Sequence, residues 1–93
     1  MLCRALFDKY KDVTADKLRE NFKYFLDGIM PTCEKYQIKM AVHPDDPAWD
    51  VFGLPRIVTC EDDLLKIASL NSSIYNGFTF CTGSLGSNLN NDL

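Results

Sequence analysis

The feature that most constrains the fold is an alternation of two kinds of segment. Two segments, the longer over residues 15–36, carry apolar side chains in steps of three and four, the spacing of one helix face. Residues 38–43 and 74–81 are short runs rich in apolar, β-branched or aromatic side chains, as buried strands are. Alternating helices and buried strands predict an α/β fold with parallel strands and helices packed outside them.

The ends of these segments carry their own signals. Thr14 and Thr59 are predicted N-caps of the two helices, the second of which has Glu61, Asp62 and Asp63 in its first turn. Pro31 should bend the first helix without ending it. Breakers between residues 44 and 55 predict an ordered loop, and the small residues 82–88 predict a second loop.

Two parallel strands cannot bury both faces of a sheet by themselves. A closed eight-stranded barrel, which takes roughly 250 residues, would supply the missing neighbours. We therefore expect residues 1–93 to form a single incomplete domain, a fragment of about two βα units of a TIM (β/α)8 barrel. Its exposed strand edges could favour self-association into a homo-oligomer.

Charge and cysteine content narrow the class of protein. The net charge of −3 offers no basic surface to nucleic acid or to an anionic membrane, so neither is an expected partner. No apolar run approaches the roughly 20 residues of a membrane span, which predicts a cytoplasmic protein. The four cysteines contain no C-x-x-C pair, and in a reducing compartment they are expected to be free thiols.

Two residues that end the predicted strands are candidate metal ligands. His43 and Cys81 would emerge side by side on the carboxyl-terminal rim of a parallel barrel, where such folds keep their sites. Imidazole and thiolate make a plausible pair for a transition metal, although a site needs further ligands. The alternative is a hydrogen-bonded loop histidine and a small buried cysteine.

The loop after His43 contains further candidates. Asp45, Asp46 and Arg56 could bind substrate, but an aspartate after proline also stabilises turns, and an arginine can form a solvated ion pair. Trp49 and Phe52 could line a sugar site or anchor the loop to the domain; we favour anchoring. The sequence does not fit a phosphatase-like cysteine loop at Cys81, because Ser87 occupies the position at which such a loop needs an arginine.

Three motifs in the order KMAVHPDDP (39–47), FGLPRIV (52–58) and NGFTFCTGSLG (76–86) resemble the mannonate dehydratase family, over most of the chain. The resemblance implies the middle-to-late part of a xylose-isomerase-like TIM barrel. It also implies dehydration of D-mannonate to 2-dehydro-3-deoxy-D-gluconate in hexuronate (glucuronate) catabolism, with Mn²⁺, Fe²⁺ or another divalent ion.

In that family the histidine and cysteine of these motifs, here His43 and Cys81, bind the metal. The other ligands, a histidine and an aspartate, and the proton-transfer residues belong to strands that these 93 residues do not contain. The resemblance therefore predicts that this chain alone is inactive. An inactive remnant or a small interaction domain is the alternative.

Overall fold

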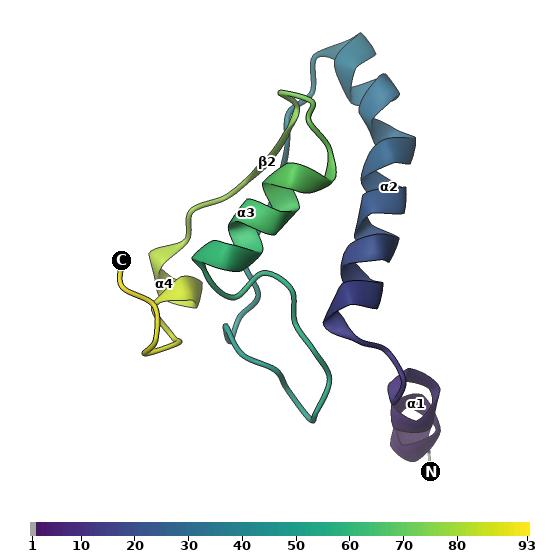
Figure 1. Ribbon diagram of the computed structural model, residues 1–93, viewed down its shortest axis with the longest axis vertical. Coiled ribbons are helices and arrows are strands. Elements are labelled where there is room, and N and C mark those ends of the chain that lie inside the picture. The colour runs from purple at the N-terminus through teal and green to yellow at the C-terminus, as the bar shows by residue number, and fades with distance from the viewer. Residues whose placement is uncertain (1) are drawn as a thin grey trace.

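The computed structural model describes residues 2–93, and the elements of this part of the chain alternate as Figure 1 shows. The long helix and the helix between the two strands lie to one side of the strand pair, a short helix follows the second strand, and the first helix lies beyond the start of the long one. The elements are α1 (Leu2–Tyr10), α2 (Ala15–Tyr36), β1 (Met40–Val42), α3 (Glu61–Leu70), β2 (Asn76–Phe78) and α4 (Thr82–Leu85). Within residues 2–93, no helix is long and apolar enough to cross a membrane.

Helix α2 has the bounds that the apolar spacing predicts. The Thr14 hydroxyl accepts a hydrogen bond from the Lys17 N–H at 3.1 Å, which confirms Thr14 as the N-cap. Pro31 lies inside the helix and does not end it. The helix ends at Gln37, whose φ of 56° lies in the left-handed region, and there the N–H of Ile38 bonds to the Cys33 carbonyl.

The two strands are parallel, as predicted, but shorter than the apolar runs. Met40 lies opposite Asn76 and Val42 opposite Phe78. The predicted start of the first strand at residue 38 is wrong, because the Ile38 N–H is taken up by the end of α2. Flanking hydrogen bonds from Met40 to Tyr75 and from Thr79 to Val42 extend the ladder by one residue at each end.

The start of α3 differs from the prediction. Cys60, not Thr59, is the N-cap, and its side chain makes no capping bond. Thr59 instead donates its N–H and its hydroxyl to one oxygen of the Asp63 carboxylate, at 2.9 and 2.7 Å. A carboxylate is a stronger hydrogen-bond acceptor than a hydroxyl, so Thr59 bonds to Asp63 in the first turn and does not cap the helix. The helix therefore begins one residue later than predicted.

Residues 82–88 were predicted to be a loop, but Thr82–Leu85 form the short helix α4. The helical turn buries Leu85 in a core cluster with Val58, Leu64 and Ile67. A second cluster comprises Leu26, Met30 and Cys33 of α2, and Leu70 packs against both clusters. Burial of Leu85 therefore outweighs the loop preference of the small residues beside it.

Helix α1 was not predicted. Among the side chains of this helix that the structure describes, Leu6 and Tyr10 are about half exposed, at 48% and 47%. The predicted fold class is confirmed as α/β with a small parallel sheet. The closed barrel remains a prediction, and the described sheet has two strands.

Candidate metal centre

His43 and Cys81 both follow the carboxyl ends of the parallel strands, at the end of the sheet nearest α4 (Figure 1). The sequence suggested that the two residues occupy equivalent positions at the ends of their strands, but the register of the sheet shows that they do not. The pairing of Val42 with Phe78 places Thr79 across from His43, so Cys81 lies two residues farther along. Because side chains two residues apart in an extended chain point to the same face of the sheet, this offset leaves both side chains on the same face.

The His43 ring is oriented by its own chain. Its Nδ1 lies 2.7 Å from the Pro44 carbonyl oxygen, which can only accept, so Nδ1 carries the proton. This bond leaves Nε2 available to a second partner. The Pro44 carbonyl raises the pKa of His43 above its usual value, and a hydrogen bond with Cys81 raises it further.

The Cys81 sulfur lies among hydrogen-bond donors. Cys81 precedes α4, and its sulfur lies near the N–H and hydroxyl of Ser84, the Gly83 N–H and the His43 ring, while the Ser84 hydroxyl donates to the Cys81 carbonyl at 3.4 Å. Together these donors lower the pKa of Cys81 from 9.0 to about 7. A substantial fraction of thiolate is therefore present at neutral pH.

These two side chains fit a divalent metal as a partial ligand set. A thiolate and an imidazole whose second nitrogen is held by a backbone carbonyl are suitable ligands for a transition metal. Among the side chains that the structure describes, however, no group of three or more from His, Cys, Asp or Glu could hold a metal ion. His43 and Cys81 are therefore two candidate ligands, and a complete site would need others.

Asp45 closes the loop that follows β1. Its N–H donates to the Val58 carbonyl at 2.8 Å, and its carboxylate accepts the Val58 N–H at 3.0 Å. The other carboxylate oxygen lies 3.7 Å from the Arg56 guanidinium. Val58 belongs to the core, so Asp45 ties both ends of this loop to the body of the fold.

The remaining loop candidates lie apart from a common site. Asp46 is exposed and offers its backbone carbonyl to Arg56 at 3.5 Å. Trp49 and Phe52 are 49% and 81% exposed, so neither is buried in the core. The buried anchor is Ala48, which has no exposed surface.

Sequence reasoning missed the residues that hold Ala48. Its N–H donates to the Ser87 hydroxyl at 3.0 Å, and its carbonyl accepts the Asn88 side-chain amide at 2.8 Å. Both partners lie just after α4, about 40 residues away along the chain. No spacing signal marks such a contact, because small polar residues are as common in unattached loops.

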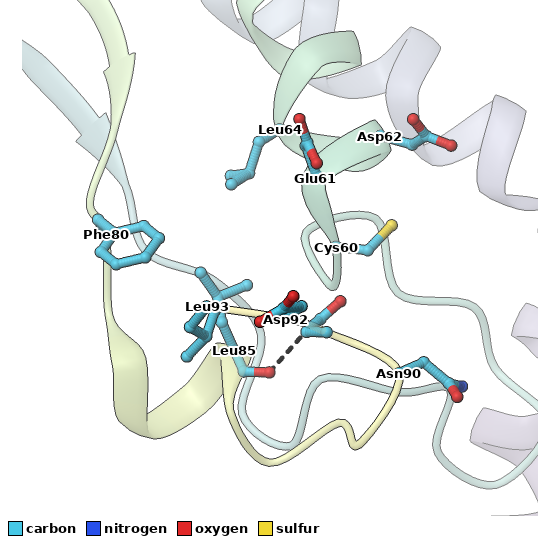
Figure 2. A pocket seen from close by; sticks show the side chains of 10 residues that line it. Cys60, Glu61, Asp62, Leu64, Phe80, Leu85, Asn90, Asp92 and Leu93 are labelled. Atoms are coloured by element: carbon cyan, nitrogen blue, oxygen red, sulfur yellow. Dashed lines mark hydrogen bonds between the residues drawn. The ribbon is translucent and has the colours of Figure 1, made fainter.

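A cavity lies elsewhere in the described part of the chain (Figure 2). Its volume is about 510 Å³, and it lies between the start of α3, Phe80 and the last residues of the chain. Glu61, Asp62 and Asp92 contribute carboxylates to its wall, while His43 and Cys81 do not line it. Three carboxylates repel the anion of a sugar acid, which argues against this cavity as its site.

Comparison with known proteins identifies the family. A family model described as D-mannonate dehydratase (UxuA) matches residues 2–93. This chain belongs to the D-mannonate dehydratase family. The mannonate dehydratase of Brachyspira hyodysenteriae is 58% identical over 90 residues, and that of Geobacillus thermodenitrificans is 52% identical over 90 residues.

The similarity to the D-mannonate dehydratase family extends to part of its three-dimensional structure. The crystal structure of mannonate dehydratase from Streptococcus suis serotype 2 superposes with a TM-score of 0.90 at 40% sequence identity. The match covers 96% of this chain and 26% of that one. The sequence matches likewise cover 97% of this chain and 24–25% of the two relatives, so the chain spans about a quarter of their length.

Proposed function

We propose that this chain supplies His43 and Cys81 as two ligands of the divalent metal in a D-mannonate dehydratase site. The observation that carries the proposal is the contact of the two side chains at the carboxyl ends of adjacent parallel strands. Active sites of parallel barrels occupy this end of the sheet. The chain around the pair matches the family over residues 2–93.

The reaction proposed is the dehydration of D-mannonate to 2-dehydro-3-deoxy-D-gluconate, in the breakdown of hexuronates such as glucuronate. A bound divalent ion would supply electrophilic stabilisation of the negative charge that develops beside the substrate carboxylate. The part of this chain is to hold the ligands in the correct protonation state. Pro44 holds the proton on Nδ1 of His43, and Ser84 and Gly83 favour the Cys81 thiolate.

Neither ligand can also serve as the base that takes the proton from carbon. The lone pair of His43 Nε2 and the thiolate of Cys81 would both be committed to the metal. We therefore place the base, and the remaining ligands, in the three-quarters of the family's length that these residues do not match. The 93 residues alone are expected to be inactive.

Asp45 is not proposed as a substrate ligand. Both of its carboxylate oxygens face groups within the loop, namely the Val58 N–H and the Arg56 guanidinium. Arg56 keeps a partly exposed side chain, at 30%, and Asp46 is exposed. Of the three loop candidates, Arg56 is the one whose charge suits an anionic sugar acid, and contact with the substrate carboxylate is proposed for it alone.

Ligand type also bears on the choice of metal. Carboxylate and water oxygens suit Mn²⁺, whereas imidazole suits Fe²⁺ and its neighbours and thiolate favours softer ions. Affinity for divalent ions generally rises from Mn²⁺ through Fe²⁺ to Co²⁺. We propose a divalent transition metal, Mn²⁺ or Fe²⁺, and expect Co²⁺ to bind the pair more tightly than Mn²⁺ does.

A chimera tests the proposal with a complete barrel. The 90 matching residues of the Brachyspira hyodysenteriae enzyme are replaced by the corresponding residues of this chain. The chimera should form the keto acid from D-mannonate, lose this activity with EDTA, and regain it with added Mn²⁺. Chimeras carrying His43→Ala or Cys81→Ser should be inactive, with Cys60→Ser as the matched thiol control.

Two results with the chimera would contradict the proposed function. An active chimera that stays active after both His43→Ala and Cys81→Ser would exclude the two residues as ligands. An inactive chimera that nevertheless folds and binds the metal would favour the alternative of a remnant that has lost its chemistry.

A further inference from the structure

The loops that carry His43 and Cys81 are joined by side chains that play no part in the proposed chemistry. The Ala48 peptide is held on both sides: Ser87 accepts its N–H at 3.0 Å, and Asn88 donates to its carbonyl at 2.8 Å. Ala48 follows His43 by five residues, and Ser87 follows Cys81 by six. These hydrogen bonds connect the two loops directly.

The Ser87 hydroxyl uses both of its hydrogen-bonding roles. While it accepts from Ala48, its own proton is donated to the Ser84 carbonyl. Ser84 is 1% exposed, and its hydroxyl donates to the Cys81 carbonyl at 3.4 Å. A series of hydrogen bonds therefore runs from the loop of His43 through Ser87 and Ser84 to the backbone of Cys81.

The segment between His43 and Ala48 has little freedom to move independently. Pro44 and Pro47 fix their own φ angles and restrict the residues before them. Asp45 is tied to Val58 by two hydrogen bonds, and Ala48 is fully buried. A segment held at Asp45 and at Ala48 fixes where its first residue, His43, can lie.

We propose that Ser87 and Asn88 clamp the Ala48 peptide and thereby position His43 beside Cys81. They are positioning residues, since neither reaches the metal ligands themselves. The inference rests on the proposed function for its metal, but the clamp also predicts a geometry that is present without metal. Loss of the clamp should let the His43 loop separate from Cys81 while the core clusters remain intact.

Two measurements on the 93-residue chain test the clamp. The first, without metal, is the nuclear Overhauser effect between the His43 ring protons and the Cys81 β protons. The second is the affinity for Co²⁺ alone, followed by the charge-transfer absorption of a cobalt–thiolate bond. Ser87→Ala and Asn88→Ala should each weaken the Overhauser effect and lower the Co²⁺ affinity by about 10–100-fold, the usual cost of losing an outer-shell partner.

Matched variants separate positioning from general damage. Ser87→Thr keeps the hydroxyl and should retain both signals. Asn90→Ala removes an exposed amide from the same loop, where only the backbone N–H of Asn90 bonds to Asn88, and should also retain both. A loss in Ser87→Ala that is absent from both of these variants is the expected pattern.

Each remaining outcome decides between the clamp and the proposed function. Unchanged Overhauser effect and unchanged Co²⁺ affinity in Ser87→Ala and Asn88→Ala would overturn the clamp and leave the function standing. A third outcome combines two results: the variants lose the Overhauser effect, and the wild-type chain binds no Co²⁺. This outcome would support the clamp and contradict the proposed metal function. Absence of the Overhauser effect from the wild-type chain would overturn the clamp.

Discussion

The loops that follow β1 and β2 present their ligands in opposite hydrogen-bonding environments. After β1, the ring of His43 faces a backbone carbonyl, which accepts a proton-bearing nitrogen. After β2, the sulfur of Cys81 faces the hydroxyl and N–H of Ser84 and the N–H of Gly83, all of which donate. One loop favours the protonated form of its ligand and the other favours the deprotonated form.

This difference shows how a fold can place unlike ligands in unlike environments, a backbone carbonyl beside one and a serine and backbone N–H groups beside the other. The pKa of His43 is raised, first by the Pro44 carbonyl, and that of Cys81 is lowered to about 7, first by the Ser84 hydroxyl. The two loops also differ in construction. The loop after β1 is held by its buried ends, Asp45 bonded to Val58 and Ala48, whereas the loop after β2 turns at once into α4.

The contrast between the two loops predicts that metal binding depends strongly on pH. Metal displaces the proton of a thiol and the Nε2 proton of an imidazolium, so affinity falls where these groups are protonated. With the pKa of Cys81 at about 7, protonation of the thiol alone should lower Co²⁺ affinity about tenfold between pH 8 and pH 6. The raised pKa of His43 should make the fall steeper.

Titration of the chain with Co²⁺ at several pH values measures this dependence. In Cys60→Ser the profile should match that of the wild-type chain. A Co²⁺ affinity that does not change between pH 6 and pH 8 would contradict the proposed difference between the two loops, because it would mean that neither loop controls the protonation of its ligand.

The second effect concerns the closure of the loop after β1. Asp45→Ala leaves the Val58 N–H without its carboxylate acceptor next to the core, which should lower the free energy of unfolding by about 1–3 kcal/mol. Asp46→Ala, which removes an exposed carboxylate, should change it by less than about 0.5 kcal/mol. Urea unfolding followed by circular dichroism measures both, and equal losses would contradict the closing role of Asp45.

The smallest effect concerns the donors around Cys81. Ser84→Ala removes the largest cause of the lowered pKa, so the pKa of Cys81 should rise from about 7 toward its ordinary value. The midpoint of the pH profile for alkylation at Cys81, resolved by peptide mass spectrometry, reports this pKa. Thr82→Ala, which removes an exposed hydroxyl at the start of the same helix, should leave the midpoint in place. A rise in both variants would show damage to α4 instead.

The sequence was sufficient for the features that depend on repeating patterns. The apolar spacing in α2 and the alternation of helices and strands predicted the parallel pairing and brought His43 and Cys81 to one end of the sheet. Features that depend on tertiary contacts could not be predicted from the sequence pattern. Asp63 captures Thr59 and moves the start of α3, and burial of Leu85 turns a predicted loop into α4.

The same distinction applies to the site. His43 and Cys81 were recognisable because each ends an apolar run, whereas Ser87 and Asn88 act on Ala48 from about 40 residues away. Asp45 and Arg56 were predicted only as candidate substrate-binding residues, and the structure turns the Asp45 carboxylate toward its own loop. Residue type indicated where polar contacts occur, and only the fold determined their partners.

The most direct test of the central claim is Co²⁺ binding by three forms of the chain at pH 7.5: wild type, His43→Ala and Cys81→Ser. If the two loops supply a joint ligand pair, the wild-type chain binds one equivalent with a cobalt–thiolate charge-transfer band. The band is then absent from Cys81→Ser, and the affinity of His43→Ala is lower by more than the roughly 10–100-fold cost of an outer-shell change. A band that persists in Cys81→Ser, or equal affinity in all three forms, would show that the metal binds elsewhere and would contradict the account.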